Sequence, residues 1–474
     1  MEEKELIKIA QEKIDSFNSE ELKRAGFLPL DGRYFPAIYY PPITMYPPTD
    51  QDEMFENFTY KTANQTSVYF HLPFCPRRCM YCHWVVSVGN SSEEIDFYLK
   101  NLEKETQIYK EKLGVKIMSP TSILIGGGTP SMLSPAQTER FLSFLAAEFD
   151  LSKCSQITCE VEPTTILGNE GMAKLKVMKK YGINRISLGV QSFDDGILKM
   201  TGRLHSSKDA IDAVKQIRLA GFESLSLDLI YGYPGSTLQN WIDTLKTAHS
   251  LDIDAYQLYR LRIVPHGAKT GAIKNVFDKS PEVFPSVKDI YIMKGLGMLI
   301  SSQNEFKETS RRVFCKGPEH NSDYLQDHTD RLYNVLGFGI SSWNNLQDRF
   351  FINTGKDLAD YYSYVNNGKL PVARGKIKTV DDRRRWAICL SLKHHGVSKK
   401  MYEKITGTIL DNYFGEKIKR LKNFGLLEED DEMLKLTEKG QFFADEVVIQ
   451  FYHPDYIPFP KSAYADRELN PYNN

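Results

Sequence analysis

The sequence has no apolar run approaching the ~20 residues of a membrane-spanning helix, and its charges almost cancel, since 60 Lys and Arg face 61 Asp and Glu. The missing run argues against a membrane span. The balanced charge gives no bulk attraction to nucleic acid and no polybasic anchor for an anionic membrane. Residues 1–17 have the pattern of a charged helix rather than of a signal peptide. We therefore expect a cytoplasmic protein that binds neither nucleic acid nor membrane.

Cysteine is also scarce, with seven in 474 residues, which fits a reducing compartment better than a disulfide scaffold. Three of the seven, Cys75, Cys79 and Cys82, are separated by only three and two residues. The apolar run 67–74 before them predicts a buried strand, so they occupy the loop that follows it. Three thiolates on one short loop can hold three irons of a [4Fe–4S] cluster. The fourth iron would stay open to a small molecule.

Two other interpretations compete for this loop. A structural zinc site takes four closed ligands, and here His83, directly beside Cys82, would have to be the fourth. A thioredoxin-like redox pair needs two cysteines and leaves Cys75 without a role. The cluster uses all three cysteines and needs no fourth.

From residue 67 onward, strand and helix patterns alternate along the chain. Such alternation predicts a parallel sheet with helices outside it, and ligands of these folds gather at the carboxyl ends of the strands. Each predicted strand carries a glycine or a polar residue near that end. The six predicted strands are 67–74, 121–126, 156–162, 185–190, 224–231 and 255–263.

The residues at these strand ends suggest binding chemistry. The glycines 126–128 form either a tight turn or a backbone that a ligand can approach closely. Glu160 and Glu162 share a strand face, and burying them requires a cationic ligand group or a barrel Arg or Lys as partner. Arg260 and Arg262 share another face and suit carboxylate recognition, although either could instead pair with Glu162 or face solvent.

The CxxxCxxC loop after a first strand resembles the radical S-adenosylmethionine (SAM) superfamily. The phrase YFHLPFC at 69–75 narrows the resemblance to the family of oxygen-independent coproporphyrinogen III oxidase and its relatives, with motifs in order to about residue 450. The resemblance implies an α/β fold, a partial (β/α)6 TIM-like barrel over 67–345. An N-terminal helix and Pro/Tyr-rich arm would occupy 1–66, and a mostly helical, winged-helix-like substrate lid 346–474.

The family's motifs also imply roles for individual residues. Cys75, Cys79 and Cys82 would hold the cluster, whose open iron takes the amine and carboxylate of SAM. A first SAM would be bound by Tyr69, Gly127 and Glu160, with Trp343 near the position of an apolar contact. A second SAM or the substrate would be bound by Tyr81, Gly128, Thr129, Gln191, Arg203 and Asp228. The candidates for direct catalytic roles are Tyr69, Glu160, Arg203 and Asp228. The alternative for Arg203 and Asp228 is an ion pair at the barrel mouth.

The resemblance implies that the cluster, reduced by a donor such as flavodoxin or ferredoxin, cleaves SAM to a 5′-deoxyadenosyl radical that takes hydrogen from a small-molecule substrate. Family members then diverge. We expect methyl or methylene transfer from a second SAM to an organic substrate such as a tetrapyrrole or another planar molecule, because Trp84 stands where coproporphyrinogen oxidases carry a cysteine. The alternatives are decarboxylation of coproporphyrinogen III, anaerobic haem opening, and haem delivery by a chaperone. We expect a monomer.

Two further segments have sequence patterns that predict their structure. The stretch 33–42 has several prolines, which exclude a helix, and forms either an extended arm packed on the barrel or a flap over the substrate. In the C-terminal domain, 428–436 predicts a short hairpin whose acidic residues 428–432 would repel phosphate. That charge argues against a DNA-binding role for the winged-helix-like domain.

Overall fold

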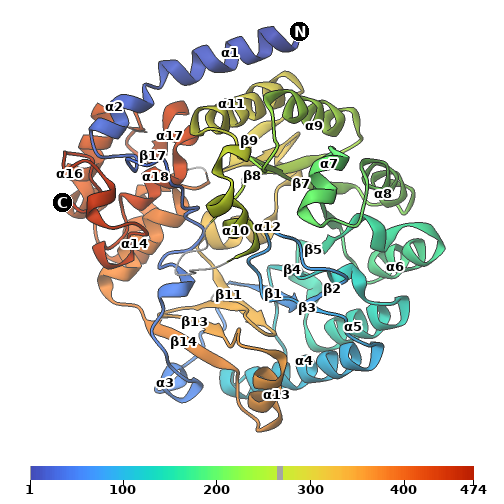
Figure 1. The fold of residues 1–474 in the computed structure, drawn as a ribbon. Helices are drawn as coiled ribbons and strands as arrows, with labels where there is room; N and C mark the ends of the chain where they lie inside the picture. The colour runs from blue at the N-terminus through green and yellow to red at the C-terminus, as the bar shows by residue number, and fades with distance from the viewer. Residues whose placement is uncertain (1, 64, 264–270, 395, 474) are drawn as a thin grey trace.

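The computed structural model describes residues 2–63, 65–263, 271–394 and 396–473, and within them one 12-stranded sheet forms the centre of the molecule. Its strand order is β14-β13-β12-β11-β1-β4-β5-β6-β7-β8-β10-β9. The middle of this sheet is parallel and curves into a partial barrel with helices outside (Figure 1). The predicted α/β fold is confirmed.

The six predicted parallel strands are all present, within one to three residues of the expected bounds. They are β1 (Thr66–Leu72), β4 (Ser122–Gly127), β5 (Gln156–Val161), β6 (Arg185–Gln191), β7 (Ser224–Tyr231) and β8 (Ala255–Arg260). The helices that follow are α4 (Ser92–Leu113), α5 (Pro135–Glu148), α6 (Gly168–Lys180), α7 (Asp195–Thr201), α8 (Ser207–Leu219) and α9 (Leu238–Ser250). Local signals set their ends: Ser91 and Glu94 form a capping box before α4, and Gly114 ends it at φ 65°.

Both edges of the sheet extend beyond the prediction. Next to β1 lies a seventh parallel strand, β11 (Asn334–Phe338), followed by antiparallel β12 (Trp343–Leu346), β13 (Arg349–Asn353) and β14 (Val372–Ile377). Next to β8 lie antiparallel β10 (Val313–Cys315) and β9 (Lys307–Ser310). β11 and β12 are buried at every residue, so they lack the apolar–polar alternation that identifies a strand. The sheet continues to residue 377, and the domain boundaries near 66 and 345 stay a prediction.

The N-terminal segment runs along the outside of the barrel before it turns inward. Helix α1 (Glu3–Ser16) packs on α11 (Val287–Gln303), and α2 (Ser19–Arg24) follows. The Pro- and Tyr-rich stretch 33–42 has no helix, as expected. It lies between the barrel and the C-terminal helices, where Tyr34 Oη donates to Asp445 Oδ2 at 2.7 Å.

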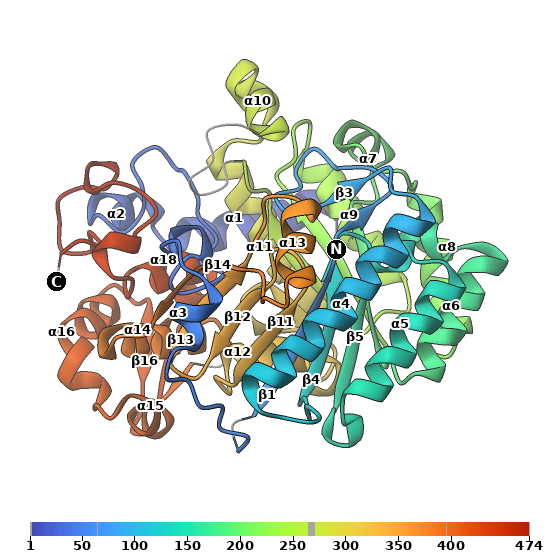
Figure 2. The ribbon, with the colours of Figure 1, turned by 90° about the horizontal axis from the view of Figure 1, so that it is seen from below.

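The C-terminal residues form a smaller body with its own hydrophobic core, which it shares with the N-terminal arm (Figure 2). Helices α14 (Val380–Ser391), α15 (Lys399–Thr406) and α16 (Leu410–Asn423) pack with a three-stranded sheet of β15 (Val397–Ser398), β17 (Met433–Leu436) and β16 (Leu427–Glu429). This is the winged-helix-like arrangement that the sequence predicts, hairpin included. The acidic hairpin is partly neutralised, because Glu429 pairs with both Lys399 and Lys422.

The other described α-helices and strands are distributed over the arm, the barrel and the C-terminal body. They are β2 (Phe74–Cys75), β3 (Ser87–Val88), α3 (Gln51–Phe55), α10 (Ala272–Lys279), α12 (Asp323–Thr329), α13 (Leu358–Asn366), α17 (Glu438–Phe442) and α18 (Ala444–Ile449). Among the helices described, none combines the length and the apolar character needed to cross a bilayer.

Candidate active site

The cysteine loop begins where β1 ends, at the carboxyl end of the barrel strands. Cys75 lies in β2, which pairs with β3 in parallel, and the Cys82 amide donates to the Cys79 carbonyl at 3.1 Å. The Met80 amide donates to the Thr201 carbonyl at 3.0 Å, which fastens the loop to the end of α7. The three thiols of the loop are free and partly exposed. The fold thus presents them together at the mouth of the barrel.

Side chains from other strands contact two of these thiols. Cys75 Sγ lies 3.4 Å from Thr129 Oγ1, and Arg203 Nη1 lies 3.7 Å from Cys79 Sγ. Burial raises the pKa of the Cys75 thiol to about 11 and also raises the pKa of Cys82. Binding to iron would offset this, because a metal stabilises the thiolate.

The donor set fits the cluster that the sequence predicts. Three sulfur ligands come from one loop, as in cysteine-bound iron–sulfur clusters, where each cysteine takes a different iron. Within the described ranges, no three His, Cys, Asp or Glu side chains converge as the ligands of a single metal ion would.

The glycine run after β4 is required by the protein's own packing. A Cβ at Gly126 would lie 2.7 Å from Glu160 Oε2, and one at Gly128 would lie 2.6 Å from the Phe74 carbonyl oxygen. Gly127 has φ +113°, and its Cβ would lie 2.7 Å from His71 Nδ1. The glycines therefore let the ends of β1, β4 and β5 meet, and they direct the Gly127 amide to Glu160 Oε2 at 3.1 Å.

Two carboxylates lie inside the barrel, Glu160 on β5 and Asp228 on β7. Burial, reinforced by the charge of Asp228, raises the pKa of Glu160 to about 7. Burial raises the pKa of Asp228 to about 6, while the positive charge of Arg185 opposes the rise. Asp228 Oδ1 is buried with no hydrogen-bond partner among the described residues. Because a buried unpaired oxygen is unfavourable, this atom fits a donor group of a bound ligand.

Glu162 finds a protein partner instead. Its Oε1 lies 2.9 Å from His205 Nδ1 and 3.4 Å from Arg203 Nη2. Arg203 Nη2 also donates to the Gly189 carbonyl at 2.5 Å, and His205 Nε2 lies 3.0 Å from the Val190 carbonyl. Arg203 thus pairs with Glu162 rather than forming the ion pair with Asp228 that was the alternative. Sequence reasoning missed His205, whose one signal is its place two residues after Arg203.

The three aromatic candidates, Tyr69, Tyr81 and Trp343, make different contacts with the rest of the protein. Tyr69 Oη lies 2.9 Å from His71 Nδ1, beside the Gly127 turn. The Tyr81 ring packs 5.4 Å from Tyr233, and its hydroxyl has no partner in the described structure. Trp343 is engaged by the N-terminal arm, since its Nε1 donates to Tyr46 Oη at 2.9 Å.

The structure therefore links some predicted residues directly and leaves others apart. Contacts join Cys75 to Thr129, Cys79 to Arg203, and Gly127 to Glu160. Gln191 ends β6 with φ 70°, at a break in the register with β7. The cofactor contacts of Tyr69, Tyr81, Gly128, Gln191, Asp228 and Trp343 stay predictions.

The chain is similar to proteins already characterised. The Radical SAM superfamily model matches residues 69–248, and the HemN C-terminal domain model matches residues 379–443. Heme chaperone HemW of Bacillus subtilis (strain 168) is 30% identical over 383 residues, covering 80% of this chain and 97% of that protein. Oxygen-independent coproporphyrinogen III oxidase of Helicobacter pylori (strain ATCC 700392 / 26695) is 26% identical over 415 residues, covering 84% and 88%.

Among solved structures, coproporphyrinogen III oxidase (HemN) from Escherichia coli superposes with a TM-score of 0.75 at 24% identity, covering 88% of this chain and 96% of that one. A parallel barrel with three cysteines after its first strand defines the radical SAM class. The chain belongs to the HemN family of radical SAM proteins, as the sequence motifs predict. Membership implies a [4Fe–4S] cluster and SAM as cofactors. The second SAM, the electron donor and the monomeric state stay predictions.

Proposed function

We propose that this protein is a radical SAM enzyme that acts on a carboxylate-bearing tetrapyrrole, with coproporphyrinogen III as the first substrate to test. The observation that carries the proposal is the pairing of arginines with aromatic rings beside the barrel mouth. Arg260 ends β8 with its guanidinium carbon 4.4 Å from the centre of the Tyr34 ring. Two residues on, Arg262 lies 5.4 Å from the Phe35 ring.

These four side chains combine the two properties that such a substrate needs. Guanidinium groups recognise carboxylates, and aromatic rings pack against a flat macrocycle. Arg260 has no acidic partner within 4 Å among the described residues, and its polar contact is with the Gly32 carbonyl. Its charge is therefore left for a ligand. The arm that carries Tyr34 and Phe35 would cover the substrate and exclude water.

Within this proposal, each part of the chain has a task. Cys75, Cys79 and Cys82 would hold the cluster, which with SAM supplies a 5′-deoxyadenosyl radical when bound. Glu160, kept in place by the Gly127 amide, would orient the first SAM. Asp228, with its unpaired Oδ1, would take a donor group of the second SAM or of the substrate.

The comparisons support the porphyrin and haem alternatives better than the carbon transfer expected first. Relatives are named coproporphyrinogen III oxidase or heme chaperone, and methyl transfer has no such support. We therefore propose oxidative decarboxylation of a propionate side chain. The 5′-deoxyadenosyl radical takes one hydrogen atom from the side chain and becomes 5′-deoxyadenosine. The side chain then loses carbon dioxide, becomes a vinyl group, and passes one electron to an external acceptor.

The test is an anaerobic assay of the reconstituted protein with SAM, dithionite, an electron acceptor and coproporphyrinogen III. We expect 5′-deoxyadenosine and carbon dioxide in step with each other, and no S-adenosylhomocysteine. An Arg260→Ala, Arg262→Ala variant should keep SAM cleavage but lose decarboxylation at least tenfold. The control variant is Arg218→Lys, because Arg218 pairs with Asp254 on the outside of the barrel. It should leave the amounts of both products unchanged. Formation of S-adenosylhomocysteine in place of carbon dioxide would overturn the proposal in favour of carbon transfer.

Haem binding is the second candidate. Two observations favour it: the 30% identity to heme chaperone HemW, and Trp84, which stands where coproporphyrinogen oxidases carry a cysteine. Trp84 is half exposed beside the cysteine loop. This candidate predicts a saturable, one-to-one haem titration and transfer of haem to an apo-acceptor, without carbon dioxide from coproporphyrinogen III.

A further inference from the structure

A cavity lies at the opposite end of the barrel from the cysteine loop. Its volume is about 1040 Å³, the size of a small-molecule site. Asn334 lines the cavity and pairs with Thr66, the first residue of β1. The cysteines, in contrast, follow the last residue of β1. A seven-residue strand therefore separates the two places, a distance of roughly 20 Å. Figure 2 shows β3 and α15 at opposite ends of the molecule.

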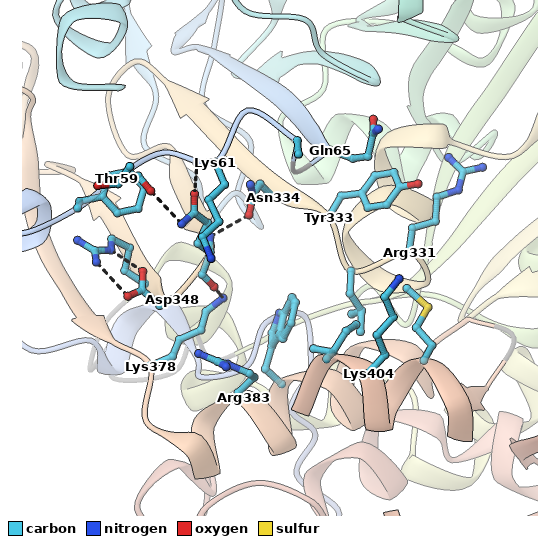
Figure 3. Close-up of a pocket in the computed structure, with 18 of the residues that line it drawn as sticks. Thr59, Lys61, Gln65, Arg331, Tyr333, Asn334, Asp348, Lys378, Arg383 and Lys404 are labelled. Carbon is cyan, nitrogen blue, oxygen red and sulfur yellow. Dashed lines mark hydrogen bonds and ion pairs between the residues drawn. The ribbon is translucent and has the colours of Figure 1, made fainter. Parts of the chain in front are cut away.

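Three parts of the chain meet around this cavity (Figure 3). The loop after α3 contributes residues 57–59 and 61, and the barrel contributes the connection 331–334 and the turn 347–349. Helices α14 and α15 of the C-terminal body supply the remaining wall. A molecule bound here would contact all three parts at once.

The lining is strongly cationic. Seven of its side chains are basic and one is acidic, and they are Lys61, Arg331, Arg349, Lys378, Arg383, Lys400 and Lys404, with Asp348. The acid is taken by Arg349, at 2.9 Å, and Arg331 pairs with Asp327 outside the lining, at 2.7 Å. Lys61, Arg383, Lys400 and Lys404 have no acid within 4 Å in the described part of the chain. Like charges gathered in one recess repel one another and attract an anion.

Lys378 adds a buried amine to this wall. Its side chain is held by Asn345 Oδ1 and by the Gln347 carbonyl, and its Nζ lies 4.3 Å from the ring centres of Phe350 and Trp386. Lys378 is 7% exposed, and no carboxylate of the described residues is paired with it. Burial lowers its pKa well below the usual range, and an anion in the cavity would reverse part of that shift.

The rest of the lining is part apolar or aromatic and part polar but uncharged. Its larger apolar and aromatic side chains are Phe58, Leu332, Tyr333, Trp386, Met401 and Ile405, and the other members are Ala63 and the polar Asn57, Thr59, Gln65, Asn334, Gln347 and Ser398. Trp386 is 5% exposed, and its Nε1 has no hydrogen-bond partner among the described residues. Cations around apolar walls suit a ligand with a flat or apolar body and charged substituents.

We propose that this cavity binds an aromatic or macrocyclic small molecule that carries two or more carboxylate or phosphate groups. The labelled side chains Lys61, Arg383 and Lys404 come from the arm loop, α14 and α15 (Figure 3), so they can reach anionic groups on different edges of one ligand. The site is separate from the cysteine loop and does not rest on the function proposed above. Its ligand would tie the arm and the C-terminal body to the barrel.

The test uses isothermal titration calorimetry on the full, reconstituted chain with two probes, ATP for phosphate and coproporphyrin III for carboxylates. The pocket variant is K61E/R383E/K404E. Its matched control is K4E/K100E/K176E, three exposed lysines without an ion-pair partner among the described residues. Both variants change the net charge equally, so their difference reports the cavity rather than bulk electrostatics. Any binding of coproporphyrin III at the active site would be the same in both variants, so it cancels from the difference between their titrations.

We expect at least one probe to bind wild type and control alike, and the pocket variant at least tenfold more weakly. The probe that responds identifies the anionic group. A neutral K61Q/R383Q/K404Q variant, with unchanged melting temperature and unchanged SAM cleavage, should show a smaller loss in the same direction. Failure of both probes to bind wild type, or equal weakening in pocket and control variants, would overturn the proposal.

Discussion

Arg203 bridges the cysteine loop and the barrel wall, with Nη1 3.7 Å from Cys79 Sγ and Nη2 3.4 Å from Glu162 Oε1. A guanidinium can span two such partners because its donors point in fixed, divergent directions. The positive charge beside Cys79 would stabilise the more negative, reduced state of a cluster bound there. One residue therefore connects the electron-accepting group to the residues that line the barrel.

Replacing Arg203 with Ala should lower the reduction potential of the reconstituted cluster and reduce product formation at least tenfold. The potential falls because a positive charge near the sulfur ligand is lost. Potentiometric titration followed by electron paramagnetic resonance measures the shift. Arg203→Lys should restore part of the potential but not the contact with the Gly189 carbonyl. An unchanged potential in Arg203→Ala would contradict the bridging role.

Asp228→Asn should separate SAM cleavage from turnover. The amide keeps the size of the side chain but removes the charge that a donor group of the ligand would meet. We expect 5′-deoxyadenosine to form at a rate close to wild type while product falls at least tenfold. Chromatography of both products in one reaction checks this. Loss of deoxyadenosine and product together would assign Asp228 to the first SAM instead.

Gly127→Ala should damage SAM binding more than its backbone strain explains. A Cβ here would lie 2.7 Å from His71 Nδ1 at a φ of +113°, so the turn that presents its amide to Glu160 must move. Gly168→Ala is the matched control, because Gly168 has φ +69° and nothing within 4 Å of a Cβ. It should cost only about 1 kcal/mol of stability. Equal SAM affinity in the two variants, measured by equilibrium dialysis, would refute the prediction.

Glu105 should make the protein less stable as pH rises toward neutrality. This fully buried carboxylate accepts hydrogen bonds from the Gly339 amide at 2.7 Å, Tyr361 Oη at 2.7 Å and Asn353 Nδ2 at 2.8 Å. Burial raises its pKa to about 7. The folded chain then keeps a proton that the unfolded chain releases near pH 4.5. The stabilisation is complete below that pH and is lost as pH rises through about 7, by about 3 kcal/mol at most.

Chemical denaturation at several pH values tests this. Glu160 and Asp228 have raised pKa values too, so the informative quantity is the difference between wild type and Glu105→Gln. Wild type should lose stability relative to the variant between about pH 4.5 and 7. Parallel curves across that range would show that Glu105 ionises normally.

Sequence patterns predicted six of the seven parallel strands, because these six are separated from one another by helices with clear boundary signals. Ser91 before α4 and Gly114 after it are examples. Strands β11 and β12 were not predicted because they are buried at every residue, which removes the apolar–polar alternation of their sequence. The cysteine loop was readable from spacing alone, since all its ligands are local.

The contacts that join distant strands were not readable in the same way. Glu162 could have bonded any cation in the barrel, and only the fold shows that His205 and Arg203 take it. The glycine run gave a similar ambiguity. The atoms that a Cβ would strike at Gly126 and Gly128 come from Glu160, Pro73 and Phe74, on neighbouring elements that no local pattern places there.

In the function proposed above, Cys75, Cys79 and Cys82 hold a cluster that cleaves SAM. The most direct measurement is 5′-deoxyadenosine formed by the anaerobically reconstituted protein with SAM and dithionite, with Cys79→Ala and Cys154→Ala beside wild type. Cys154 is a free cysteine outside the loop, since it follows α5 in the sequence. We expect deoxyadenosine from wild type and Cys154→Ala, and neither cluster absorbance nor deoxyadenosine from Cys79→Ala. Deoxyadenosine from Cys79→Ala at the wild-type rate would contradict it.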